Sequence, residues 1–196
     1  MHHLIRFIFS VLLSLTTLPL YAAVENYMID PNHSYVLWHI NHFGFSNPSG
    51  KWIAEGLLQY DETNLQNSSV KATIKVSDMI TGLPELDKHL RGKLFFNTDQ
   101  FPTATFVSNK VEGKDNAITK LYGDLTVKGI TKPIALSVRF NKKGINPITN
   151  NETLGFSAST SLLRSDFGIK SLLPDLSDQV QLEIEVEAYK PSQQEE

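Results

Sequence analysis

The sequence predicts an all-β protein built from about eight antiparallel strands. Apolar and polar residues alternate in one segment after another, which is typical of strands that bury a single face. Short connections rich in glycine, proline, asparagine and aspartate separate these segments and favour antiparallel neighbours. The chain shows no helical stretch of crossover length between the segments, so a parallel sheet is not expected.

The expected strands follow one another along most of the chain. The alternating segments are 36–40, 52–60, 70–76, 103–111, 121–127, 134–140, 154–158 and 180–188. The last is the clearest, because Val180, Leu182 and Ile184 share one face while glutamine and glutamate occupy the other. Turn sequences such as SNPSG and KGITKP connect neighbouring segments. The pattern alone fits either a barrel or a sandwich.

One short helix is expected between the third and fourth strands. In GLPELDKHLR, at 82–91, Pro84 suits a first helical turn, and Leu83, Leu86 and Leu90 recur at helical spacing. The following GKLFFNTDQFP carries more aromatic surface than a solvent loop should show. We expect this insertion to cover one open end of a barrel, either as a simple lid or as a lid that also forms part of a ligand mouth.

The N-terminal segment is typical of a secretory signal. Residues 1–23 combine Arg6, an apolar run over 7–15 and small residues at Ala22 and Ala23. The run is shorter than the roughly 20 apolar residues of a membrane span, so an uncleaved anchor is the less favoured alternative. We therefore expect cleavage, one mature domain over 24–190, a polar tail over 191–196, and export to the periplasm without a stable membrane anchor. The chain has no cysteine, so neither a disulfide nor a cysteine-linked lipid is possible.

Charge and motifs argue against several functions. A formal net charge of -3 does not suggest nucleic-acid binding, which concentrates positive charge. His39 and His42 lie three positions apart on an expected strand and so point to opposite faces, which disfavours a shared metal ion. The sequence lacks a G-x-S-x-G nucleophile motif. We expect no metal, no cofactor and no catalysis, although a spatial triad cannot be read from one sequence.

The inward face mixes large and small side chains. The large ones are Trp38, Trp52, Phe106, Phe140 and Phe156, and the small ones are Ala54, Gly56, Ala72, Ala104, Gly123 and Ala158. Such a mixture can leave an apolar void, since an eight-stranded barrel is wide enough for one small ligand. It can equally interlock into a solid core.

Four sequence motifs carry a resemblance to a known family. They are IDPNHSYVLWHINHFGFSNPSGKW at 29–52, DKHLRGKLFFNTDQFPTATFVS at 87–108, LYGDLTVKGITKPIAL at 121–136 and SLLRSDFGIKSLLPDLSDQVQLEIEVEA at 161–188. In this order and over roughly 27–189, the chain resembles the YceI-like family of exported proteins. The resemblance implies an eight-stranded antiparallel lipocalin-like barrel with a short helical lid. It also implies an elongated hydrophobic cavity that holds a polyisoprenoid or similar amphiphile.

Two groups of ligand-binding residues are expected on this basis. Inward aromatic and histidine side chains would line the cavity: Trp38, His42, Phe43, Phe45, Trp52, Phe106, Phe156 and Phe167. Residues of the lid and mouth would be His89, Leu90, Arg91, Phe95, Phe96 and Arg164. Structural roles remain open for several of them. Arg91 could pair with Asp87 and Arg164 with Asp166, while His42 and His89 could be satisfied within the fold.

The expected function is that of a periplasmic binding or carrier protein. It would sequester a long-chain isoprenoid or similar amphiphilic lipid in the cavity and act in transport, storage or stress response. The lipid is the expected partner, and the formation of a homodimer is left open. The alternatives are a solid-core module that binds another protein and, less favoured, a hydrolase.

Overall fold

The computed structural model describes residues 24–114 and 117–191, so the predicted signal segment and most of the predicted tail lie outside the described residues. The strands in this part are β1 (Glu25–Ile29), β2 (Tyr35–His42), β3 (Ser49–Tyr60), β4 (Ser69–Lys75), β5 (Thr103–Lys114), β6 (Ala117–Val127), β7 (Ile130–Ile145), β8 (Glu152–Leu163) and β9 (Leu176–Tyr189). The helices are α1 (Pro84–Arg91) and the short 3-10 helices η1 (Leu65–Asn67), η2 (Val76–Asp78) and η3 (Arg164–Phe167). No helix in the described ranges has the length and apolar character needed to cross a membrane.

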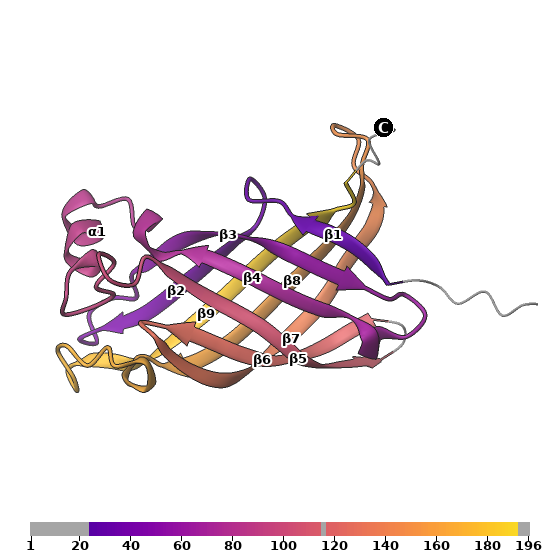
Figure 1. The fold of residues 1–196 in the computed structure, drawn as a ribbon. Helices are drawn as coiled ribbons and strands as arrows, with labels where there is room; N and C mark the ends of the chain where they lie inside the picture. The colour runs from indigo at the N-terminus through magenta and orange to yellow at the C-terminus, as the bar shows by residue number, and fades with distance from the viewer. Residues whose placement is uncertain (1–23, 115–116, 192–196) are drawn as a thin grey trace, which may run out of the picture.

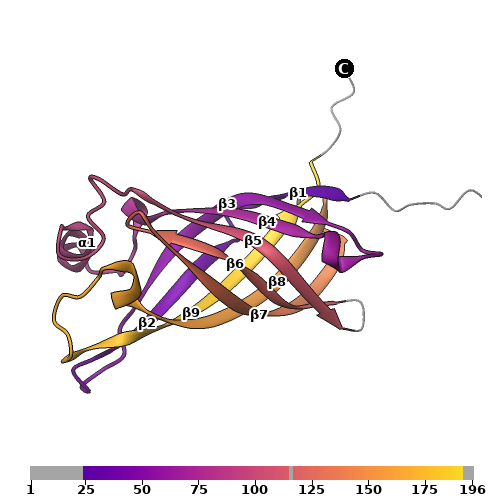
Figure 2. The ribbon, with the colours of Figure 1, turned by 60° about the horizontal axis from the view of Figure 1, so that its bottom comes forward.

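The strands close into an antiparallel barrel, as predicted (Figures 1 and 2). Hydrogen-bonded neighbours run from β2 through β9, β8, β7, β6 and β5 to β4, and the pairing of β4 with β3 completes the ring. β1 and β2 share one place in this ring. β1 pairs with residues 56–60 of β3 and 188–189 of β9, whereas β2 pairs with 49–53 of β3 and 176–185 of β9. The nine described strands therefore occupy eight positions.

Strand β1 is the element that the alternation did not reveal. It has five residues, of which only Tyr27 and Ile29 turn inward. Two apolar positions are too few to separate a strand from a loop by periodicity. The two side chains are nevertheless almost fully buried, and Tyr27 packs edge-on against Tyr60 of β3. Burial in the barrel holds β1 in place.

The segments 41–48, 76–102, 128–130 and 163–175 gather at one end of the barrel, which we call the lid end (Figures 1 and 2). Backbone hydrogen bonds between Lys51 and Ile80 fasten the lid insertion to the start of β3. The ring of Phe101 approaches Gly129 in the turn between β6 and β7. The far end includes residues 61–68, the end of β5, the start of β6 and the 146–151 loop (Figure 1).

Helix α1 begins at Pro84, as predicted, but its leucines pack less completely than expected. Leu90 packs against the buried residues beneath it. Leu86 is half-buried, and Leu83 precedes the helix with most of its surface exposed. The expected apolar face is therefore carried mainly by Leu90 in the last turn of the helix.

Candidate functional site: an apolar cavity through the barrel

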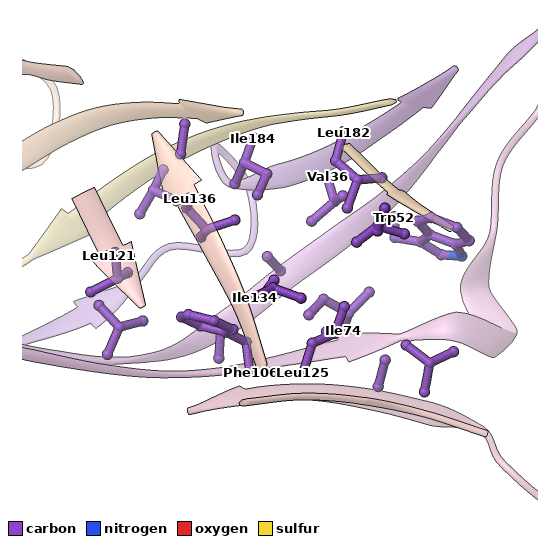
Figure 3. Close-up of a pocket in the computed structure, with 18 of the residues that line it drawn as sticks. Val36, Trp52, Ile74, Phe106, Leu121, Leu125, Ile134, Leu136, Leu182 and Ile184 are labelled. Carbon is purple, nitrogen blue, oxygen red and sulfur yellow. The ribbon is translucent and has the colours of Figure 1, made fainter. Parts of the chain in front are cut away.

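A cavity of about 220 Å³ runs inside the barrel (Figure 3). A space that holds one water molecule needs only about 10–15 Å³. All nine described strands contribute to its wall, together with Phe96 from the lid and Phe167 and Ile169 from the loop after β8. The interpretation as a solid core is therefore wrong for this barrel.

Small residues keep this space open. Ala54, Ala72, Ala104 and Ala158 all line the cavity, so four places on its wall lack a long side chain. The predicted mixture of large and small inward residues therefore leaves a void instead of interlocking completely. Gly123 of β6 shows how tightly the remaining wall is packed. A β-carbon built there would lie 2.6 Å from Cζ of Phe106.

The lining is almost entirely hydrocarbon. Figure 3 shows Val36, Ile74, Leu125 and Ile184 directed into the same space from different strands. Polar side chains reach the wall only near its ends in the described chain: Ser68 and Ser69 toward the far end, and Arg164 at the lid end. Such a wall attracts an apolar chain through exclusion of water and offers little directional bonding.

Arg164 is 5% exposed and serves the fold. Its Nε donates to the carbonyl of Ser177 at 2.8 Å and its Nη2 to that of Leu176 at 3.0 Å. Its Nη1 donates to the carbonyls of Ile169 at 3.1 Å and Ser171 at 2.8 Å. Burial lowers the pKa of Arg164. The suggested pairing with Asp166 is wrong, because the guanidinium donates to backbone carbonyls instead. These hydrogen bonds hold the 164–178 loop in place.

Trp52 and Phe96 form the cavity wall at the lid end. Their rings meet edge-on with centroids 5.4 Å apart. Trp52 lines the cavity as expected, and Phe96, expected at the mouth and lid, lines it too. Trp38 does not. It is 7% exposed but stands beside Trp52, with ring centroids 6.0 Å apart. The indole Nε1 atoms of Trp38 and Trp52 are buried and have no acceptor among the described residues.

The other lid residues divide into buried and outward-facing positions. Phe95 is buried with Ile169 and Leu176 rather than in the cavity, and Leu90 packs against them. His89 is exposed and lies edge-on against Phe95 with ring centroids 4.9 Å apart. The lid is thus held by its own small apolar cluster, and the His89 ring does not line the cavity.

Arg91 and Asp87 do not form the suggested ion pair. Arg91 Nε donates to the carbonyl of Ser77 at 2.7 Å and Nη2 to that of Met79 at 3.2 Å. The Asp87 carboxylate accepts from the backbone and the hydroxyl of Thr81 at 2.9 and 2.6 Å. Both side chains bind the segment that precedes α1, so they position the lid.

His42, Phe43 and Phe45 were expected in the lining, and this expectation is wrong. All three are exposed, and Phe45 presents 90% of its surface to solvent. The β2 register shifts between Ile40 and His42, and the chain then turns, with Phe43 in the left-handed region at φ 56°. Period-two alternation does not extend past such an irregularity. Phe106, Phe156 and Phe167 do line the cavity.

The emphasis on aromatic residues missed most of the wall. Aliphatic side chains provide the larger part of the lining, including Val36, Ile74, Leu121, Leu125, Ile134, Leu136, Leu182 and Ile184. The signal that identifies them is the same alternation that predicts the strands, since inward residues of a hollow barrel face the ligand space. In the described ranges, no three His, Cys, Asp or Glu side chains gather as a metal site.

Comparisons with known proteins agree with this geometry. Residues 27–188 match the sequence profile of a family described as YceI-like domain. Protein YceI of Shigella flexneri is 36% identical over 172 residues, covering 86% of this chain and 89% of that protein. The crystal structure of a Campylobacter jejuni YCEI protein aligns with a TM-score of 0.68 at 30% identity, covering 75% of this chain and 87% of that one.

A more distant structure shares the fold. It is a polyisoprenoid binding domain from Saccharophagus degradans, implicated in plant cell wall breakdown. It aligns with a TM-score of 0.63 at 11% identity and covers 86% of this chain and all of that domain.

Proposed function

This chain belongs to the YceI-like family, and from that premise we propose that it is a periplasmic carrier that holds a long-chain isoprenoid or similar amphiphilic lipid inside its barrel. The observation that carries the proposal is the hydrocarbon-lined cavity. The description of the Saccharophagus degradans domain as polyisoprenoid-binding supports the same ligand class.

The affinity would come from the length of the ligand. Each methylene moved from water into such a wall contributes about 0.8 kcal/mol, so an extended chain needs few polar contacts. The shape of the wall supports a linear ligand, since it continues from Phe96 at the lid end to Val111 and Ile118 near the far end. Branched isoprenoid chains and straight acyl chains are both compatible with a wall of aliphatic and aromatic side chains.

A binding role accounts for the polar groups near the cavity better than a catalytic one. The N–H groups of Arg164 donate to backbone carbonyls. The Ser68 hydroxyl accepts a hydrogen bond from the backbone N–H of Asp61 at 3.0 Å and so stabilises the loop after β3. These side chains stabilise the ends of the barrel. We propose that the N-terminal segment 1–23 directs export, which would place the carrier in the periplasm. There the apolar chain of a lipid would have to be shielded from water.

The test is mass spectrometry of the solvent extract of protein purified from an export-competent bacterial host. We expect one class of prenyl or long-chain amphiphile at close to one molecule per barrel. The purified protein, once delipidated, should also take up a fluorescent polyprenyl probe. An extract free of lipid, together with no uptake of the probe, would contradict the proposal.

A further inference from the structure

Exposed apolar side chains concentrate at the lid end. Of the thirteen large hydrophobic residues that are exposed in the described chain, eight lie on lid-end segments: Phe43, Phe45, Ile80, Leu83, Leu94, Ile130, Leu163 and Leu172. They come from four separate segments that Figures 1 and 2 place at this end. Large apolar surface that folding leaves in water commonly marks an interaction site.

Backbone conformation gives a second, independent indication. Phe43 and Leu172 both adopt left-handed φ values, of 56° and 61°. Glycine and asparagine adopt this region readily, whereas bulky apolar residues rarely do. The protein thus keeps a large apolar side chain at two positions where both solvent exposure and backbone conformation disfavour it. Such outliers persist only where the surrounding structure holds them, and they cluster at binding sites and switch regions.

The segments at this end also contribute to the cavity wall. Phe96 contributes to the cavity wall, and Leu94 is exposed two residues earlier in the same lid segment. In the loop after β8, Ile169 lines the cavity and Leu172 is exposed. The apolar inner wall and the exposed apolar loops therefore belong to the same pieces of chain.

The features of this end favour a lipid bilayer as its partner. Phe45, Leu94 and Leu172 lie on loops between the strands and helices, at the end of the barrel that the lid covers. Basic and acidic residues are mixed on these segments, since Lys88, Lys93 and Lys170 occur together with Glu85 and Asp175. These described segments therefore do not form a strongly positive or strongly negative surface, which would favour a charged protein partner or an anionic lipid. Burial of Phe45 and its neighbours in the membrane interface would remove them from water.

We infer that the lid end docks on the surface of a phospholipid bilayer, with the side chains of Phe45, Leu94 and Leu172 entering the boundary between headgroups and acyl chains. A lipid could then move between membrane and cavity without crossing water. That movement rests on the proposed function, whereas docking itself does not. Because apolar contact dominates, binding should need no anionic lipid and should change little with salt.

Flotation with phosphatidylcholine vesicles tests the inference on protein purified from an export host, its N-terminus established by mass spectrometry. Wild-type protein should float with the vesicles at low and high salt. Phe45→Ser should bind at least about tenfold more weakly, since one large apolar side chain no longer leaves water. Ile148→Ser is the matched control: Ile148 is 92% exposed, comparable with Phe45, but lies at the far end. It should bind as the wild type does.

Leu172→Asn separates function from folding. Asparagine suits the left-handed conformation, so the urea midpoint should stay equal or rise while vesicle binding falls roughly tenfold. The inference is overturned if wild-type protein does not float, or if Ile148→Ser loses as much binding as Phe45→Ser. A dimer that light scattering detects and Phe45→Ser abolishes would also overturn it, by showing that a second copy covers this face. Lipid extracted from Phe45→Ser reports on the carrier function separately.

Discussion

The indole of Trp38 lies directly over the backbone of Gly50 on the neighbouring strand. The two residues are register partners in β2 and β3, and a β-carbon on Gly50 would come within 2.6 Å of Cε2 and 2.7 Å of Nε1 of the indole. Trp38 in turn stands beside Trp52, which forms the cavity wall. Because Gly50 has no side chain, the Trp38 indole can lie against the backbone of β3 and beside Trp52 at the lid end.

Gly50→Ala should therefore displace the Trp38 indole toward Trp52. We expect the free energy of unfolding to fall by about 1–3 kcal/mol, the usual cost of overpacking a core. Urea unfolding measures this change, and near-UV circular dichroism reports the altered tryptophan environment. The control is Gly155→Ala in β8, where the nearest atom to an added β-carbon is Cβ of Asn141 at 3.6 Å. Equal losses in the two variants would contradict this account of Trp38.

Arg164 should be irreplaceable by lysine. Its planar guanidinium reaches carbonyls in several directions, and an ammonium on a flexible stem cannot span them. Arg164→Lys should lower the free energy of unfolding by about 2–4 kcal/mol, because carbonyls are left unpaired in a buried site. Limited proteolysis should then cut within 164–178.

Arg139→Lys provides the comparison for that experiment. Arg139 is exposed and donates to the Ser157 hydroxyl at 3.2 Å. Its replacement should change the free energy of unfolding by no more than about 0.5 kcal/mol. If Arg164→Lys is as stable and as protease-resistant as Arg139→Lys, the loop does not depend on the guanidinium.

Asp61 should make stability depend on pH in acid. Its carboxylate accepts from the Asn67 side chain at 2.8 Å, from the Thr63 hydroxyl at 2.8 Å and from the backbone of Asn64 at 2.8 Å. These hydrogen bonds, that of Asn67 first, lower the pKa of Asp61 to about 2. Because the folded-state pKa lies below the unfolded value of about 3.9, this stabilisation is complete above pH 4 and is lost as pH falls toward 2.

The comparison of Asp61→Asn with wild type isolates this contribution from those of other carboxylates. Between pH 5 and pH 2.5, the urea midpoint of wild type should fall further than that of the variant. Identical falls would show that the 61–67 loop does not hold a depressed pKa. The sequence offers DETN as a turn at this place, but only the structure shows that the loop folds around the aspartate.

The strands could be predicted from sequence because each one buries a single face, whereas the choice of a barrel over a sandwich came from the family resemblance. In β9, Val180, Leu182 and Ile184 face the cavity and the intervening glutamine and glutamate face solvent, as the alternation indicates. Periodicity fails where the chain leaves a regular strand. The register shift beyond Ile40 sends Phe45 outward, although the aromatic character of that residue suggested an inward position.

Polar partners were the least predictable part. Neighbours in sequence suggested Asp87 for Arg91 and Asp166 for Arg164, but both arginines bind backbone carbonyls. Carbonyls are present at every residue, so no sequence pattern indicates which ones a loop will direct toward a buried guanidinium. Whether the void would remain open was equally undecided, because it depends on where side chains of adjacent strands meet.

Ala158 lines the cavity and Ser159, the next residue of β8, is exposed on the outer face. This pair tests the central claim that the hollow itself binds the lipid. Ala158→Phe should fill part of the space and leave the barrel folded, whereas Ser159→Phe adds the same side chain outside it. Native mass spectrometry of the three exported proteins is the most direct measurement. We predict one bound lipid in wild type and Ser159→Phe and a loss of most of it in Ala158→Phe; full retention by a folded Ala158→Phe would contradict the account.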